Sequence, residues 1–144
     1  MTGELPDVNL LLALAWPNHQ FHRQAREWFA GDSDRTWHTC AVTQLGFVRL
    51  SSNPAYTPHA KTPLEASLLL ATMTAHPDHR FVAESSSLDS PEFSLIARNL
   101  QGYRQVTDAG LLHLARDRGL RLVTFDRRLE VICPFPDLVR VLTA

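Results

Sequence analysis

The chain lacks the features that mark secreted, zinc-binding and membrane-spanning proteins. Its two cysteines, Cys40 and Cys133, are too far apart for zinc-ligand spacing, and we expect both to be small buried residues. The longest apolar run, Val8 to Trp16, is too short to cross a bilayer. No positively charged segment precedes an apolar run at the N-terminus, so we expect no secretory signal and a cytoplasmic location.

Net charge and lysine are also scarce. The formal net charge is −1, and Lys61 is the only lysine. This balance argues against a protein that binds polyanions through its overall charge, so any contact with nucleic acid must depend on a local basic patch or a bound cation. With 44% hydrophobic and 20% charged residues, the composition is that of a globular protein able to bury a core. We find no internal repeat or linker and expect one domain over residues 1–144.

The most informative stretch runs from Tyr103 to Leu129. It begins with a helix that Thr107 is expected to cap, and Gly119 stands where a helix-ending residue in the left-handed conformation is wanted. Leu120 to Phe125 then has the composition of a buried strand, and Asp126 closes it.

The rest of the chain also alternates between strand and helix patterns. Further helices are expected after Val8, Asn18, Thr43, Thr62 and Ser90, with Ser51–Thr62 as a loop. The other expected strands are Glu4–Asp7, Trp37–Val42, Phe81–Ala83 and Leu138–Leu142. This alternation predicts a three-layer α/β/α fold with a central, mostly parallel sheet of four to five strands.

Three carboxylates are predicted to meet at one edge of that sheet. Asp7 and Asp126 follow strands, and Asp108 begins a helix, so all three should lie where open α/β folds bind ligands, beyond the carboxyl ends of the strands. At separations of ~5 Å and a dielectric of ~20 they repel by roughly 3 kcal/mol per pair. A hard divalent cation such as Mg²⁺ is the natural counter-charge, and it suits phosphodiester cleavage by activated water. Arg127 and Arg128, which follow Asp126 directly, are placed to contact a phosphate group.

Histidines and aromatic residues carry weaker signals. His19 and His22 have the HxxH spacing of some metal sites, but on an amphipathic helix we expect them to be solvated. Trp16, Trp28 and Phe29 are expected to pack in the core rather than to form a base-stacking platform.

Four short motifs follow one another along the chain. They are D-x-N-x-L-L-A-L at residues 7–14, T-Q-L-G-F-V-R at 43–49, V-T-D-A-x-L-L-x-L-A at 106–115 and T-F-D-R-x-L at 124–129. Together they resemble the PIN-domain family and, more narrowly, VapC-type toxins of type II toxin–antitoxin systems. The resemblance implies a single PIN-like ribonuclease domain, an endoribonuclease dependent on Mg²⁺ or Mn²⁺. It also implies an RNA substrate, a cognate VapB-type antitoxin and a homodimer.

The resemblance also assigns site residues. Asp7 and Asp108 match the metal-binding aspartates and Asp126 the later acidic residue of the site, so these three are the candidate catalytic and metal ligands. Asn9, Gln44 and Thr124 are candidate supporting residues. Gln44 is the main departure, because the family commonly has a glutamate in this segment.

Two other readings stay open at this stage. One is a catalytically impaired PIN-like module that binds RNA or protein, for which Gln44 is the main support. The other is a phospho-receiver domain, which also gathers aspartates at strand ends. That chemistry needs a lysine near the site, and Lys61 lies in the proline-containing loop, so we disfavour it.

Overall fold

In the computed structural model, which describes residues 2–31, 34–83 and 86–143, five parallel strands form one sheet in the order β3-β2-β1-β4-β5. The strands are β1 (Thr2–Pro6), β2 (Arg35–Cys40), β3 (His79–Val82), β4 (Arg121–Thr124) and β5 (Val139–Val141). The predicted α/β class and parallel sheet are confirmed, with the strand ends shifted by up to two residues. Chain order reverses between β1 and β4, which are neighbours in the sheet, and this is the point where such folds place their ligands.

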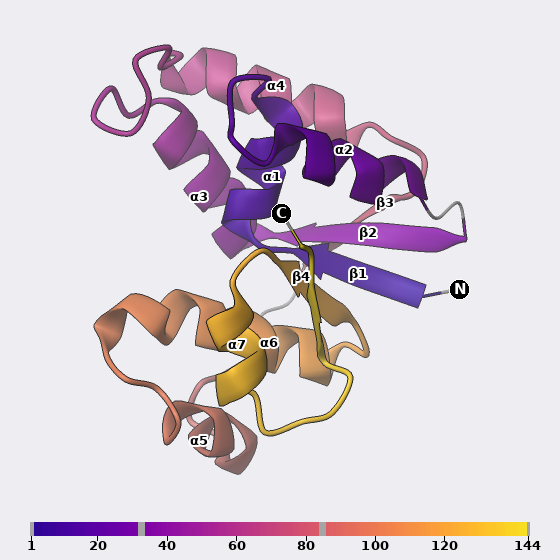
Figure 1. The fold of residues 1–144 in the computed structure, drawn as a ribbon, viewed down its shortest axis with the longest axis vertical. Coiled ribbons are helices and arrows are strands. Elements are labelled where there is room, and N and C mark those ends of the chain that lie inside the picture. The colour runs from indigo at the N-terminus through magenta and orange to yellow at the C-terminus, as the bar shows by residue number, and fades with distance from the viewer. Residues whose placement is uncertain (1, 32–33, 84–85, 144) are drawn as a thin grey trace.

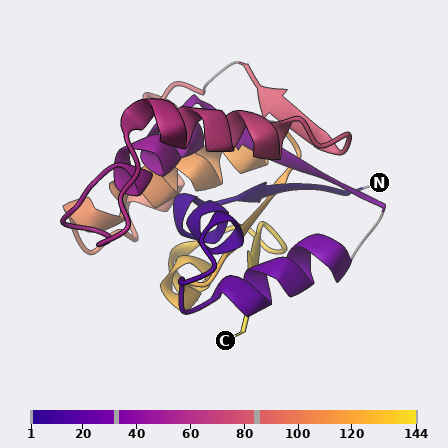
Figure 2. The same ribbon diagram turned by 90° about the horizontal axis from the view of Figure 1, so that it is seen from above.

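Helices cover both faces of the sheet. They are α1 (Val8–Ala15), α2 (His22–Gly31), α3 (Ala41–Ser51), α4 (Pro63–Thr74), α5 (Pro91–Ala97), α6 (Val106–Asp117) and α7 (Arg127–Ile132). In Figure 1, α1 to α4 lie above the sheet and α5 to α7 below it. Seen from above in Figure 2, α1 lies between α2 and α4. No helix of the described residues is long and apolar enough to cross a membrane.

Local signals explain most of the helix ends. Thr62 and Glu65 exchange backbone and side-chain hydrogen bonds of 2.9 and 3.1 Å in the capping box that starts α4. Gly119 has φ of 66° and follows α6, as predicted. The prediction for Thr107 was wrong, because a 3₁₀ turn over Tyr103–Gln105 starts the helix earlier and leaves Thr107 inside it. Asn18 does not cap α2 either, since that helix begins at His22.

Two apolar clusters lie on opposite faces of the sheet. The cluster above it packs α1 and α2 against strand residues such as Trp37 and Val123, while the one below it packs α6 and α7 against Leu5 and Leu122. Trp28 is buried as expected, but Phe29 and Trp16 are only half-buried. Cys40 is buried as predicted; Cys133 is half-buried, which corrects the expectation for that residue.

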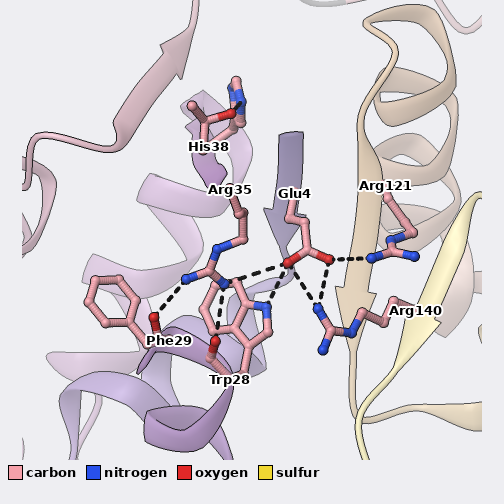
Figure 3. A network of polar contacts seen from close by, with 8 residues as sticks. Glu4, Trp28, Phe29, Arg35, His38, Arg121 and Arg140 are labelled. Atoms are coloured by element: carbon pink, nitrogen blue, oxygen red, sulfur yellow. Dashed lines mark hydrogen bonds and ion pairs between the residues drawn. The ribbon is translucent and has the colours of Figure 1, made fainter. Parts of the chain in front are cut away.

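One buried acidic residue, Glu4, lies beside the apolar cluster above the sheet and accepts a hydrogen bond from Trp28 of that cluster. Glu4 of β1 has 1% of its surface exposed and accepts hydrogen bonds from Trp28 Nε1 (2.9 Å), Arg121 Nη2 (2.9 Å) and Arg140 Nη1 (3.1 and 3.2 Å), as Figure 3 shows. Arg35 lies 3.5 Å from the same carboxylate. Burial alone would raise the pKa of Glu4, but these hydrogen bonds outweigh it and lower the pKa overall. The network ties α2 and the strands β2, β4 and β5 to β1.

Candidate active site at the carboxyl edge of the sheet

A pocket of about 280 Å³ opens at the carboxyl ends of β1 and β4, and all three predicted aspartates line it. We call it the acidic pocket and define it by Asp7, Asp108 and Asp126. The parallel register that pairs Pro6 with Val123 brings two of them together, because each aspartate follows its strand by one or two residues. The third arrives on the first turn of α6.

Asp7 is the most deeply placed of the three carboxylates, with 5% of its surface exposed. It caps α1: Oδ1 accepts from the backbone N–H of Leu10 at 2.9 Å, and Oδ2 accepts from the Thr124 hydroxyl at 2.6 Å. Burial, together with the charges of Asp108 and Asp126, raises the pKa of Asp7 to about 7, against the opposing effect of the two hydrogen bonds. The site therefore holds a carboxyl group that favours a positive partner.

Asp108 lies in the first turn of α6 and is half-buried. Burial raises its pKa, and so does the charge of Asp126, while Arg128 works in the opposite direction. In the described part of the chain no cation forms an ion pair with Asp7 or Asp108. No direct ion pair therefore relieves the repulsion between them, and Arg128 acts on Asp108 only through its charge.

Asp126 is in a different state. It caps α7 and forms a bidentate ion pair with Arg128, in which Nε lies 3.0 Å from Oδ1 and Nη2 lies 3.1 Å from Oδ2. The Arg128 hydrogen bonds lower the pKa of Asp126. Thr124 links this residue to Asp7, because its hydroxyl donates to Asp7 and accepts from the backbone N–H of Asp126 at 3.0 Å.

The oxygen ligands of the acidic pocket suit a hard divalent cation in type, although few of them are carboxylates gathered closely together. Carboxylate and hydroxyl oxygens line the acidic pocket, and Mg²⁺ is usually held by one or two carboxylates plus water and substrate phosphate. Across residues 2–31, 34–83 and 86–143, no group of three or more His, Cys, Asp or Glu side chains is gathered closely enough to hold a metal ion. Among the described residues, Asp7 and Asp108 are the two pocket carboxylates without an ion pair, whereas Asp126 is paired with Arg128.

The remaining predicted residues divide between the pocket and its surroundings. Asn9 and Thr124 line the acidic pocket, whereas Gln44 does not: its amide donates to Thr39 Oγ1 at 3.0 Å. Arg127 and Arg128 are exposed at the start of α7. Tyr56, which was not among the predicted residues, also lines the pocket, from the loop after α3. A lone aromatic residue in a polar loop was the one available signal.

The sequence is similar to that of a known domain family and of known ribonucleases. The sequence model of the PIN domain matches residues 5–133. Ribonuclease VapC38 of Mycobacterium tuberculosis is 49% identical over 122 residues, which are 85% of this chain and 84% of that protein.

Solved structures agree at the level of the fold. VapC20 of M. tuberculosis, described as a Sarcin-Ricin loop cleaving toxin, has a TM-score of 0.65 at 14% identity, over 89% of this chain and 93% of the other. A DNA-bound VapBC from Salmonella typhimurium has a TM-score of 0.63 at 15% identity, over 98% of each chain. With a domain match over most of its length and a close relative named as a ribonuclease, this chain belongs to the PIN-domain family.

Proposed function

We propose that this protein is the toxin of a toxin–antitoxin pair, an endoribonuclease that hydrolyses RNA phosphodiester bonds in the acidic pocket. The observation that carries the proposal is the meeting of Asp7, Asp108 and Asp126, which are distant in sequence, in one pocket at the switch point of the sheet. The 49% identity to Ribonuclease VapC38 supports the reaction class.

Asp7 and Asp108 would hold a divalent cation, Mg²⁺ or Mn²⁺, with Asp126 as the third ligand. When bound, such an ion supplies Lewis-acid chemistry to the phosphoryl group and to water. Thr124 keeps the Asp7 carboxylate oriented, since one hydroxyl contacts both Asp7 and the backbone that carries Asp126. Arg127 and Arg128 stand at the rim and would contact the RNA backbone.

A VapB-type antitoxin is the partner we propose, because the fold matches a structure of DNA-bound VapBC over 98% of the chain. A homodimer is the proposed assembly. Size-exclusion chromatography with light scattering, on the protein alone and mixed with the product of an adjacent small gene, tests both.

The decisive experiment compares RNA cleavage by the purified protein in Mg²⁺ or Mn²⁺ and in EDTA. Asp108→Asn and Asp126→Asn should abolish cleavage and growth arrest while the variants keep the wild-type circular dichroism spectrum. Asp89→Asn, at an exposed position outside the pocket, is the matched control and should cleave normally. A wild type that binds RNA without cutting it would favour the impaired binding module instead.

A further inference from the structure

A second hollow adjoins the acidic pocket and shares a wall with it. It has a volume of about 270 Å³ and lies between the connection from α1 to α2 and the loop that follows α3. Trp16, His19 and Pro58 are among its lining residues, and Tyr56 lines both this hollow and the acidic pocket. We call it the aromatic hollow. No acidic residue lines the aromatic hollow, whereas three aspartates line the adjoining acidic pocket.

Of the two large aromatic residues of the hollow, Trp16 is held through its ring and Tyr56 through its backbone. Trp16 donates from Nε1 to the hydroxyl of the fully buried Ser51 at 3.1 Å, which fixes the indole plane. The Tyr56 side chain is 44% exposed, and its backbone is tied into a turn, because its N–H donates to the Asn53 carbonyl at 2.9 Å. In the described residues no other ring stacks on Tyr56. The exposed part of Tyr56 at the wall of the two spaces is thus available to a ligand.

Positive charge lies beside the rings. The ammonium group of Lys61, the only lysine of the chain, is 5.6 Å from the centre of the Trp16 ring. Its backbone N–H donates to the Ser51 carbonyl at 2.9 Å, so the lysine and the indole are anchored at the same serine. A polyanionic strand that leaves the acidic pocket across the aromatic hollow therefore passes a cation rather than further carboxylates.

His19 connects the hollow to the acidic pocket through Asn9. The backbone N–H of Phe21 donates to His19 Nδ1 at 3.0 Å, so a neutral ring carries its proton on Nε2. That proton faces Asn9 Oδ1 at 3.0 Å. Asn9 lines the acidic pocket, and its amide NH₂ has no partner in the described part of the protein. The histidine thereby orients Asn9 as a hydrogen-bond donor at the junction of the two spaces.

We propose that the aromatic hollow binds one unpaired nucleotide of the RNA, next to the phosphate that is cut. Its base stacks on Tyr56 at the wall between the two spaces, Trp16 borders the same subsite, and Lys61 contacts a flanking phosphate. Unstacked bases of single-stranded RNA are commonly recognised on aromatic side chains in this way. The proposal rests on the ribonuclease function proposed above, and it makes the hollow the source of selectivity for a looped or unpaired site.

The test uses a fluorescein-labelled 12-nucleotide single-stranded RNA with all positions randomised, cut by the purified protein and sequenced. The wild type should show a base preference at one position beside the cut. Tyr56→Ala should erase that preference and lower kcat/KM by about 5- to 150-fold, the range for loss of one stacked base. Tyr56→Phe should retain both, because the ring remains. Tyr103→Ala, at a highly exposed tyrosine outside both spaces, is the matched control and should behave as wild type.

A second measurement separates stacking from a structural effect. In the preferred sequence, an abasic nucleotide at the selected position should slow the wild type as much as Tyr56→Ala does, and should slow Tyr56→Ala no further. If Tyr56→Ala cuts with wild-type rate and preference and loses only antitoxin affinity, the hollow belongs to the protein partner and the proposal is wrong. A wild type that cuts total cellular RNA but not this single strand shows that an unpaired nucleotide is not what the hollow reads, and the proposal is wrong. A wild type that cuts neither RNA refutes the ribonuclease function itself.

Discussion

Replacing Glu4 by glutamine is the sharpest test of how this fold is held together. The substitution keeps the size of the side chain and removes one buried negative charge. Arg35, Arg121 and Arg140 then face one another without a counter-charge. Trp28 also donates to the same carboxylate, so the perturbation reaches α2 as well as the sheet.

The expected cost is about 3 kcal/mol of the free energy of unfolding. Removing one partner of a buried ion pair costs about 3–5 kcal/mol. The lower end applies here because the Arg121 and Arg140 side chains are each 37% exposed and gain water, while Arg35 keeps the carbonyls of Trp28 and Phe29. For a chain of this size the melting temperature should fall by about 6–12 °C.

The effect should also depend on pH in a defined direction. The folded-state pKa of Glu4 is lowered, so its stabilisation is complete above the pKa of about 4.3 for an unfolded glutamate and is lost as the pH falls through the folded value. Wild type and Glu4→Gln should therefore differ by a constant amount between pH 8 and 5, and converge below about pH 4.

Urea denaturation followed by circular dichroism at several pH values measures this difference. Glu27→Gln is the matched control, because its pair with Arg23 is exposed on both sides and should contribute less than about 0.5 kcal/mol. Equal losses for the two variants at pH 7, or a difference that persists unchanged at pH 3, would refute the reasoning.

Three further outcomes are expected. Mn²⁺ at ten times its dissociation constant should raise the melting temperature of the wild type by about 3–6 °C and leave Asp7→Asn unchanged, as scanning fluorimetry would show; equal shifts would place the ion elsewhere. Arg128→Gln should raise the pKa of Asp126 toward its ordinary value in carbon-detected NMR of the carboxyl groups, and an unaltered titration would contradict the pairing. Gly119→Ala should cost about 1 kcal/mol of unfolding free energy because of its positive φ, whereas Gly110→Ala inside α6 should gain about 0.5–1 kcal/mol; similar changes for both would argue against the strain.

The meeting of the three aspartates was predictable from the sequence for a simple reason. Parallel strands end at one edge, so residues that follow strands or begin the next helix must gather there. The alternation of strand and helix patterns was enough to place Asp7, Asp108 and Asp126 without any contact information. The capping box at Thr62 and the left-handed Gly119 were predictable because both depend on neighbouring residues alone.

The partners of individual side chains were not predictable, whether they lie near or far along the chain. Glu4 reads as an ordinary strand residue, yet its partners Arg121 and Arg140 come from the other end of the chain. Gln44 of α3 donates to Thr39 of β2, a hydrogen bond that residue spacing alone does not reveal. The ion pair between Arg128 and Asp126 depends on the rotamer of the Arg128 side chain at the start of α7.

Two of the three pocket aspartates, Asp7 and Asp126, are also the residues that begin α1 and α7. Alanine at either position would remove a helix cap as well as a carboxylate, and it would lower protein abundance in the cell together with activity. Loss of toxicity in an alanine scan would then report folding and chemistry at once. Asparagine still caps a helix, so the Asp→Asn variants keep the fold and their phenotype reports the loss of the carboxylate alone.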